Sequence, residues 1–240
     1  MNILAVNGSP RGKHGNTEQL LQPFLKGARD AGAETEVIYL KDKKIEHCTG
    51  CYTCWGKTPG VCAHRDDMEE LLEKRRQADV TVYATPLYVY TVTGLMKDFM
   101  DRSLPLAQPY ITKSGDRYAH PRRYEDQKIK KAVLISNCGF PGRQYFTGLV
   151  ETFRNLYSKP GNELAGAILC GAGIMLGIPE ARQYIQWYLD ACEDAGREVA
   201  QAGAISEQTQ SVLERELIDF ETYVNNANAY WDRTLAGQSQ

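Results

Sequence analysis

The order of apolar and polar positions along the chain predicts strands that alternate with helices. Short apolar runs rich in β-branched and aromatic residues are typical of strands buried on both faces. Between them, apolar residues that recur every three or four positions predict helices. We expect strands at 2–7, 34–40, 78–84, 131–136 and 163–170. Helices are expected to begin at 16, 66 and 94 and to cover 147–157, 179–202 and 207–235.

This order of elements indicates a doubly wound α/β fold with a five-stranded parallel sheet covered on both faces. In such sheets ligands bind beyond the carboxyl ends of the strands, where the strand order reverses. The loops 8–16, 85–94 and 136–143 each follow a predicted strand. We therefore expect these three loops to meet at one site.

Two stretches lie outside this core, the insertion 103–130 and the extension 205–240, which leaves 1–204 as the main domain. The insertion is rich in proline and charged residues without clear periodicity. It is interpreted as a solvated loop, with a lid or cofactor-docking loop as the alternative.

The extension contains the helix predicted at 207–235, and apolar residues recur along it at alternating steps of four and three. They are Leu213, Leu217, Phe220, Val224, Ala227 and Trp231. Such a stripe is covered either by the domain's own core or by another subunit. Since the five-stranded fold is complete before this helix begins, we favour a subunit contact and a homo-oligomer, a dimer or a tetramer.

Composition and charge exclude several classes of protein. The chain has 240 residues, of which 42% are hydrophobic and 24% charged, and its formal net charge is −2. Neither nucleic acid nor an acidic membrane surface is therefore expected as the main partner. The sequence has no apolar run as long as a membrane span and no signal-peptide pattern. A cytoplasmic location is the expectation.

The loop after the first strand predicts an anion site. It ends where a helix begins, so free backbone N–H groups and the positive end of the helix dipole point to one spot. Ser9, Asn16 and Thr17 add hydrogen-bond donors, and Arg11 adds a positive charge. The loop lacks the dinucleotide and nucleoside-triphosphate fingerprints, which favours a monophosphate. The alternative is an ordinary connection in which Asn16 or Thr17 caps the helix.

Four of the seven cysteines lie close together in the sequence, at Cys48, Cys51, Cys54 and Cys62. Short loops between thiolates let successive sulfurs turn toward one cluster, as in iron–sulfur proteins. Zinc also accepts four cysteines, although usually as two separated pairs. Free or redox-active thiols are the third possibility, whereas a disulfide scaffold fits poorly with a large domain of this kind.

The opening loop and the cysteine spacing resemble known families. Gly8-Ser9-Pro10-Arg11 followed by Asn16-Thr17 resembles the FMN phosphate loop of flavodoxin-like NAD(P)H-dependent FMN reductases. The cysteine loop, 47–63, resembles the cluster motif of iron–sulfur flavoproteins. With Thr85–Arg102, the likeness covers most of residues 1–104. It implies a flavodoxin-like fold, bound FMN, and a 4Fe-4S cluster on the four cysteines.

Two further loops are expected to wall the flavin ring, which needs a flat apolar surface and backbone groups for its polar edge. The first loop supplies Pro86, Leu87 and Tyr88. The second loop contains Asn137, Cys138 and Gly139. Cys138 is interpreted as a packing residue rather than a nucleophile, and Cys170 and Cys192 as core residues.

The resemblance implies an FMN-dependent oxidoreductase that passes electrons between FMN, an iron–sulfur cluster and a redox carrier or small acceptor. NAD(P)H is a candidate electron donor. The first alternative is an NAD(P)H-dependent reductase of FMN, quinones or azo compounds without a cluster, and the second is a non-catalytic flavodoxin-type electron carrier. No side chain is assigned as a catalytic acid or base, because hydride passes directly between nicotinamide and flavin.

Overall fold

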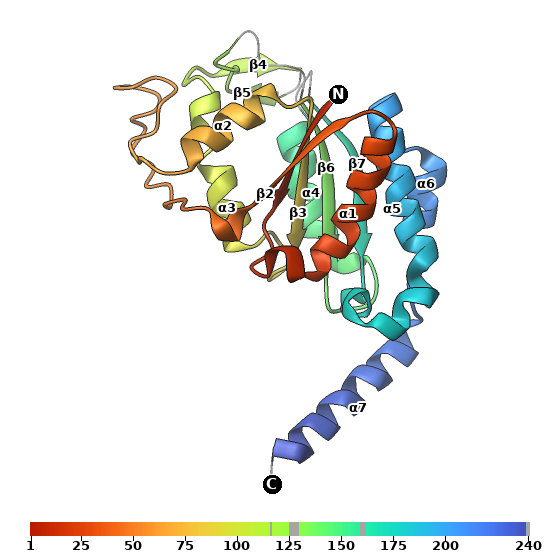
Figure 1. Ribbon diagram of the computed structural model, residues 1–240. Helices are drawn as coiled ribbons and strands as arrows, with labels where there is room; N and C mark the ends of the chain where they lie inside the picture. Colours follow the sequence, from red (N-terminus) through yellow and green to blue (C-terminus); the bar gives the residue numbers. More distant parts are fainter. Residues whose placement is uncertain (116, 125–129, 159–161, 239–240) are drawn as a thin grey trace.

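The computed structural model describes residues 1–115, 117–124, 130–158 and 162–238. A five-stranded parallel sheet lies at its centre (Figure 1). Its strands are β1 (Asn2–Asn7), β2 (Glu34–Tyr39), β3 (Val80–Pro86), β6 (Lys130–Asn137) and β7 (Asn162–Cys170). They follow the order β2-β1-β3-β6-β7 with parallel pairing throughout. This is the flavodoxin-like order, so the predicted fold class is confirmed.

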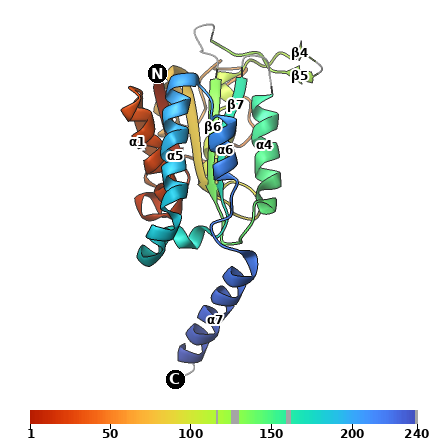
Figure 2. The same cartoon turned by 90° about the vertical axis from the view of Figure 1, so that its right-hand side faces the viewer.

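Helices cover both faces of the sheet (Figure 2). One face packs against α1 (Asn16–Asp30), α5 (Arg182–Ala202) and α6 (Glu207–Leu213). The other packs against α2 (Met68–Gln77), α3 (Gly94–Asp101) and α4 (Thr147–Tyr157). Short 3-10 turns lie at Gly12–His14, Leu40–Asp42, Leu104–Leu106, Gln144–Phe146, Gly173–Gly177 and Pro179–Ala181. No helix within the described ranges is both long enough and apolar enough to cross a bilayer.

Helices α1 and α5 approach so closely that their backbones touch. A Cβ atom at Gly196 would lie 1.8 Å from the carbonyl oxygen of Phe24, and one at Gly27 would lie 1.8 Å from that of Glu193. Backbone on both sides leaves no flexible side chain that could move aside. The two glycines therefore set the distance between these helices.

The C-terminal extension differs from the prediction of one helix at 207–235. The structure has two helices, α6 and α7 (Phe220–Gln238), separated by residues 214–219. Leu213 at the end of α6 is fully buried, and it belongs to the same hydrophobic core as the buried residues of α1 and α5. The first member of the predicted stripe is therefore covered by the domain itself.

Local hydrogen bonds explain this break. The guanidinium of Arg143 donates to the carbonyl oxygen of Leu213 at 3.0 Å and so satisfies the end of α6. The carboxylate of Asp219 accepts from the backbone N–H of Thr222 at 2.9 Å, as a residue that caps a helix start does. The apolar spacing continued across residues 214–219, but these end contacts stop one helix and begin another.

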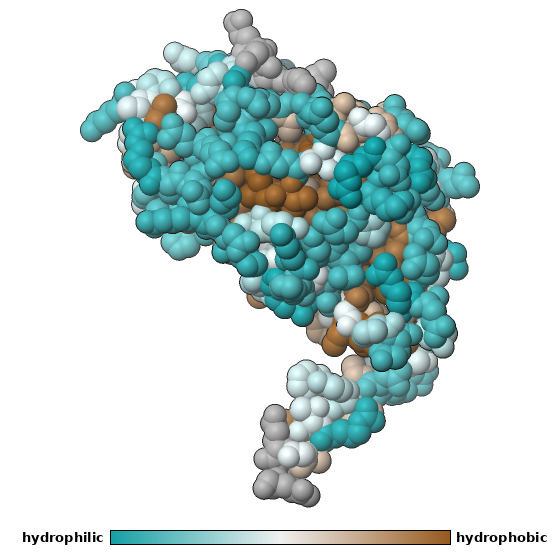
Figure 3. Space-filling model, in the orientation of Figure 1, coloured by the Kyte–Doolittle hydropathy of each residue, from teal (hydrophilic) through white to brown (hydrophobic). Residues whose placement is uncertain are grey.

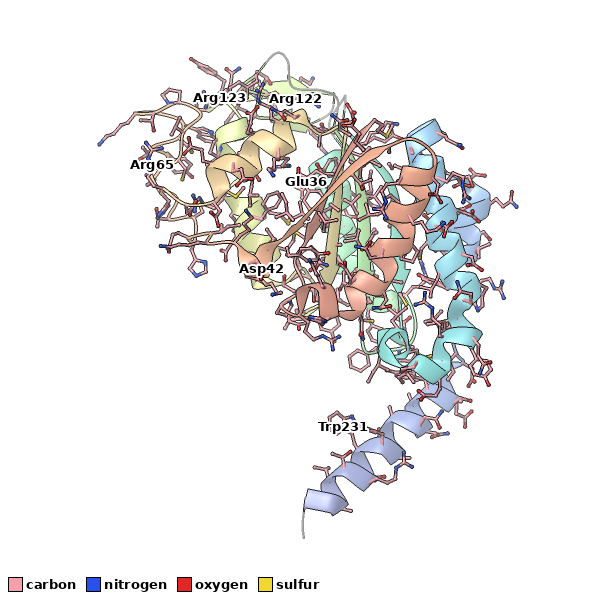
Figure 4. The ribbon with its side chains drawn as sticks, viewed as in Figure 1. Glu36, Asp42, Arg65, Arg122, Arg123 and Trp231 are labelled. Atoms are coloured by element: carbon pink, nitrogen blue, oxygen red, sulfur yellow. The ribbon has the colours of Figure 1, made fainter. Side chains whose placement is uncertain are left out.

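Helix α7 extends away from the body of the molecule (Figures 1 and 2). The hydroxyl of Tyr223, near its start, donates to the carbonyl oxygen of Gly139. Farther along, Trp231 is 57% exposed and lies far from the rest of the chain (Figure 4). Tyr230 and Leu235 are also exposed. Most of the apolar surface of α7 is thus uncovered within one copy of the chain.

The described part of the insertion packs on the cysteine loop, beside α2. It includes a hairpin of β4 (Thr112–Ser114) and β5 (Arg117–Ala119), and residues 116 and 125–129 lie outside the described residues. The ring of His120 lies 4.7 Å from that of Trp55 in the cysteine loop. Figure 4 shows Arg122 and Arg123 on this side of the molecule.

We expect Gly196→Ala to lower the free energy of unfolding by about 3 kcal/mol or more, because the new methyl group overlaps the backbone of α1. Chemical denaturation measures this change. Gly94→Ala is the matched control, since a Cβ at Gly94 would meet no atom within 4 Å. Equal stability of the two variants would show that the helices can separate at no cost.

Candidate functional site

The site forms at the carboxyl edge of the sheet, and a buried asparagine shapes its first loop. Asn7 ends β1 and is fully buried. Its Oδ1 accepts from the backbone N–H of Ser9 at 2.8 Å, and its Nδ2 donates to Glu18 on α1 at 2.8 Å. Tyr39, at the end of β2, donates its hydroxyl hydrogen to the same carboxylate at 2.7 Å. These bonds fix the turn from β1 into α1.

Thr93 ties the second loop to the first. It caps the start of α3, where its Oγ1 accepts from the N–H of Met96 at 3.2 Å. The same hydroxyl donates to the carbonyl oxygen of Gly8 at 2.7 Å. A Cβ at Gly8 would lie 2.9 Å from the Cβ of Met96, so the close approach of α3 requires glycine there. The sequence analysis did not assign a role to Asn7, Glu18 or Thr93. The one signal in the sequence is that each is a polar residue at the predicted boundary of a strand or helix.

The third loop is bound to both of the others through Asn137 at the end of β6. Its Nδ2 donates to Thr17 Oγ1 at 2.8 Å, and its carbonyl oxygen accepts from the N–H of Leu87 at 2.8 Å. Asn16 donates from Nδ2 to the carbonyl oxygen of Gly173 at 2.7 Å, which joins the turn after β7. Four loops that are far apart in the sequence are thereby held together.

One cavity of about 180 Å³ lies where the three predicted loops meet. All ten residues assigned to the flavin line it. They are Ser9, Arg11, Asn16, Thr17, Pro86, Leu87, Tyr88, Asn137, Cys138 and Gly139. The predicted convergence of the loops is therefore observed, while the binding of a cofactor by these residues stays a prediction.

The polar end of this cavity suits an anion. Arg11 is exposed, whereas Ser9 and Thr17 are buried. The first turn of α1 has N–H groups without partners inside the helix. The Thr17 hydroxyl oxygen accepts from Asn137 and so keeps its own hydrogen to donate. A Cβ at Gly15 would lie 2.5 Å from Ser9 Oγ, so only glycine leaves this cradle open.

The apolar rim carries a strained turn. Tyr88 and Thr91 exchange backbone hydrogen bonds at 3.0 and 3.1 Å across a two-residue turn. Its central residues Val89 and Tyr90 have φ of 47° and 64°, and Val89 is 90% exposed. A β-branched residue in the left-handed region costs free energy, and such strain is often found at functional sites. The turn places Tyr88 at the edge of the cavity.

The three cysteines outside the cluster loop are buried. Burial raises the pKa of the Cys138 thiol, which therefore stays protonated at neutral pH. Its Sγ lies 3.2 Å from the carbonyl oxygen of Phe140. Cys170 and Cys192 lie in the core with raised pKa values, again because of burial. The prediction that these two are core residues is confirmed.

The four cysteines of the loop are neighbours, but they are not gathered into a ligand set. Cys48 and Cys51 are exposed and Cys54 is buried. Burial raises the pKa of Cys54, and the nearby thiols of Cys62, Cys48 and Cys51 raise it further. Over the described ranges, no three His, Cys, Asp or Glu residues are close enough together to hold a metal ion. Four thiols are the donor type that iron–sulfur clusters take, but the described structure does not bring these four together.

Two arginines hold this loop from different sides. The Arg102 guanidinium forms a fork with the Asp66 carboxylate at 2.7 and 2.9 Å, and both side chains are only 1% exposed. Arg102 also donates to the carbonyl oxygen of Glu46 at 2.6 Å, so one guanidinium joins the two ends of the loop. Arg123 of the insertion donates to the carbonyl oxygen of Cys54 at 3.3 Å.

Comparison with known proteins agrees with this geometry. Residues 1–114 match the family of NADPH-dependent FMN reductases. An iron-sulfur flavoprotein of Archaeoglobus fulgidus is 43% identical over 105 residues, which are 44% of this chain and 46% of the relative. One from Methanocaldococcus jannaschii is 40% identical over 106 residues, or 44% and 53%. The resemblance to FMN reductases and iron–sulfur flavoproteins is thus confirmed for the first half of the chain.

The match spans about half the length of these curated relatives. An FMN-dependent NADH-azoreductase from Bacillus anthracis, solved in complex with FMN, has the same fold with a TM-score of 0.60 and 16% identity. That alignment covers 83% of this chain and 99% of the azoreductase. The flavodoxin-like fold therefore extends beyond the matched residues 1–114 to the second part of the sheet.

Proposed function

We propose that this protein is an FMN-dependent NAD(P)H oxidoreductase that binds FMN in the cavity at the carboxyl edge of the sheet. The observation that carries the proposal is the convergence of three loops, with a polar cradle at one end and an apolar wall at the other. The match of residues 1–114 to the FMN-reductase family supports the same cofactor. Bound FMN would supply the transfer of hydride and of single electrons.

The residues of the cavity divide into two tasks. Ser9, Thr17 and the first turn of α1 would bind the phosphate through hydrogen bonds, and Arg11 would add a charge. Pro86, Leu87 and Tyr88 would cover one side of the ring and exclude water from it. Asn137, Cys138 and Gly139 would border the ring on the β6 side. None of these side chains needs to exchange a proton with a substrate during hydride transfer.

We further propose that Cys48, Cys51, Cys54 and Cys62 hold an iron–sulfur cluster, of the 4Fe-4S type. Their spacing and the iron-sulfur flavoproteins among the relatives support this. A redox carrier or a small acceptor would then exchange electrons with the cluster.

An FMN reductase without a cluster is the second candidate. It is favoured by one observation, since the four thiols do not converge on a point in the described structure. Such an enzyme would reduce free flavin, quinones or azo compounds directly at the rim of the cavity.

The uncovered apolar side of α7 supports a homo-oligomer. Hydrophobic residues also reach the surface where the body meets the start of this helix (Figure 3). Phe140, Ile174 and Ile178 are among the exposed apolar residues of the loops there. We propose that this surface packs against a second copy of the chain.

Removing the positive charge at the cradle tests the FMN site. Arg11→Gln is expected to weaken FMN binding about tenfold or more and to leave riboflavin binding unchanged, because only FMN carries the phosphate. Fluorescence titration of the flavin-free protein measures both affinities. Lys13→Gln is the control, since this lysine lies over the Tyr39 ring instead. An equal loss for FMN and riboflavin would contradict the assignment.

The cluster is tested by metal analysis of protein purified without oxygen. The wild type is expected to contain iron, acid-labile sulfide and FMN, and to absorb broadly in the visible range beside the flavin bands. Replacement of any one of the four cysteines by serine should remove iron while FMN stays bound, because the two sites use different loops. Cys170→Ser is the control, because it replaces a cysteine outside the loop and should leave the iron content unchanged. FMN without iron in the wild type would favour the second candidate, and zinc would indicate a structural site.

A truncation tests the oligomer. Removal of the residues after Ile218 deletes α7 but keeps α6, whose Leu213 belongs to the core. Light scattering is expected to give a smaller species that still binds FMN. In the full chain, Trp231→Glu should also give the smaller species. Asn225→Glu, on another side of α7, should leave the oligomer intact. A full-length monomer would overturn the subunit contact.

A further inference from the structure

The loop after β6, which borders the cavity, is bound to the turn after β7 on both sides of Gly139. The carbonyl oxygen of Cys138 accepts from the N–H of Gly173 at 2.7 Å. The carbonyl oxygen of Phe140 accepts from the N–H of Ala172 at 2.8 Å. Gly139 lies between these two bonds and lines the cavity, so the position of its peptide group shapes the cavity wall.

The peptide group that follows Gly139 is oriented from outside the loop, by α7. The hydroxyl of Tyr223 donates to the carbonyl oxygen of Gly139. Neither crowding nor a left-handed backbone requires glycine at this position, and glycine has more conformations open to it than any other residue. In a planar trans peptide the carbonyl and the following N–H point in opposite directions, so the bond fixes the N–H of Phe140 as well.

Tyr223 is well placed for this contact, because the chain before it is bound to the same loop. Arg143, at the far end of the loop, donates to the carbonyl oxygen of Leu213 at 3.0 Å and lies 3.5 Å from the carboxylate of Glu214. The N–H of Tyr223 donates to the carbonyl oxygen of Asp219 at 3.1 Å. Burial raises the pKa of Tyr223, so its hydroxyl keeps the hydrogen that it donates.

We propose that Tyr223 is a positioning residue for the flavin ring, because its hydroxyl sets the orientation of the Gly139–Phe140 peptide at the cavity wall. This rests on the proposed binding of FMN in that cavity. A flavin ring needs backbone groups at fixed positions along its polar edge. Without the hydroxyl this part of the wall could turn, and the ring rather than the phosphate would lose binding free energy.

The same hydrogen bond couples α7 to the cofactor. A coupling free energy between two sites acts equally in both directions. If Tyr223 holds the loop in the form that binds the ring, bound flavin must in turn hold Tyr223 and the first turns of α7 in place. Helix α7 also carries the proposed subunit contact, so occupancy of the flavin site and assembly would share this one bond.

The variant Tyr223→Phe removes the hydroxyl alone, and fluorescence titration of the flavin-free full chain measures the affinities for FMN and riboflavin. We expect both affinities to fall about fivefold, the usual effect of one hydrogen bond, because both ligands carry the ring. Arg11→Gln, in contrast, is expected to weaken FMN alone. Tyr230→Phe is the matched control, since it removes a hydroxyl from an exposed tyrosine farther along α7 and should change neither affinity.

Hydrogen exchange supplies a readout that a merely structural contact would not move. FMN is expected to slow the exchange of backbone amides over residues 220–226 in the wild type, and this protection should be lost in Tyr223→Phe. Truncation after Ile218 removes the hydroxyl together with the rest of α7. It should therefore weaken both flavins at least as much as Tyr223→Phe does.

The outcomes separate this inference from the function on which it rests. Wild-type protein that binds neither flavin would overturn both. Unchanged affinities in Tyr223→Phe, with Arg11→Gln still selective against FMN, would overturn the role of Tyr223 and leave the flavin site in place. If the hydroxyl only anchors α7, its removal would lower the free energy of unfolding of the flavin-free protein but leave both affinities as in the wild type, which would also overturn the role.

Discussion

The side-chain amide of Asn7 is the contact on which the geometry of the site depends. Parallel strands end at the same edge, but their loops leave that edge with polar backbone groups that have no ladder partner. Asn7 satisfies one of these groups, at Ser9, and also binds Glu18 on α1. Thr93 likewise satisfies the backbone carbonyl oxygen of Gly8, and Asn137 donates to the side-chain hydroxyl of Thr17 at the start of α1. Polar side chains at strand and helix ends thus connect the loops that form the cavity.

The cysteine loop is held at its ends and in its middle by contacts with two arginines. Its ends are joined by the buried pair of Arg102 and Asp66, and its middle is held by Arg123 through a backbone carbonyl. Between these anchors, Cys48 and Cys51 stay exposed. Breaking a buried ion pair is far more costly than breaking a surface pair, so the base of the loop is firmly held.

The two C-terminal helices have different roles in the structure. Helix α6 contributes Leu213 to the core and belongs to the body, whereas α7 touches the body mainly at its start, where Tyr223 reaches Gly139. Because Gly139 lines the cavity, α7 is attached directly beside the proposed flavin site. A subunit contact at the start of α7 would therefore lie next to a loop of the proposed flavin site.

The sequence by itself determined the order of strands and helices and the loops that form the cavity. Local apolar periodicity reports burial, and parallel strands of a doubly wound sheet always bring their carboxyl ends together. The tertiary structure alone decided the rest. Asn7, Thr93 and the Arg102–Asp66 pair act between segments that are far apart in the sequence, so no local pattern distinguishes them from ordinary polar residues. The break between α6 and α7 was hidden for a similar reason. The apolar spacing runs through it without interruption, and the bond from Arg143 to the end of α6 forms only once the sheet has folded.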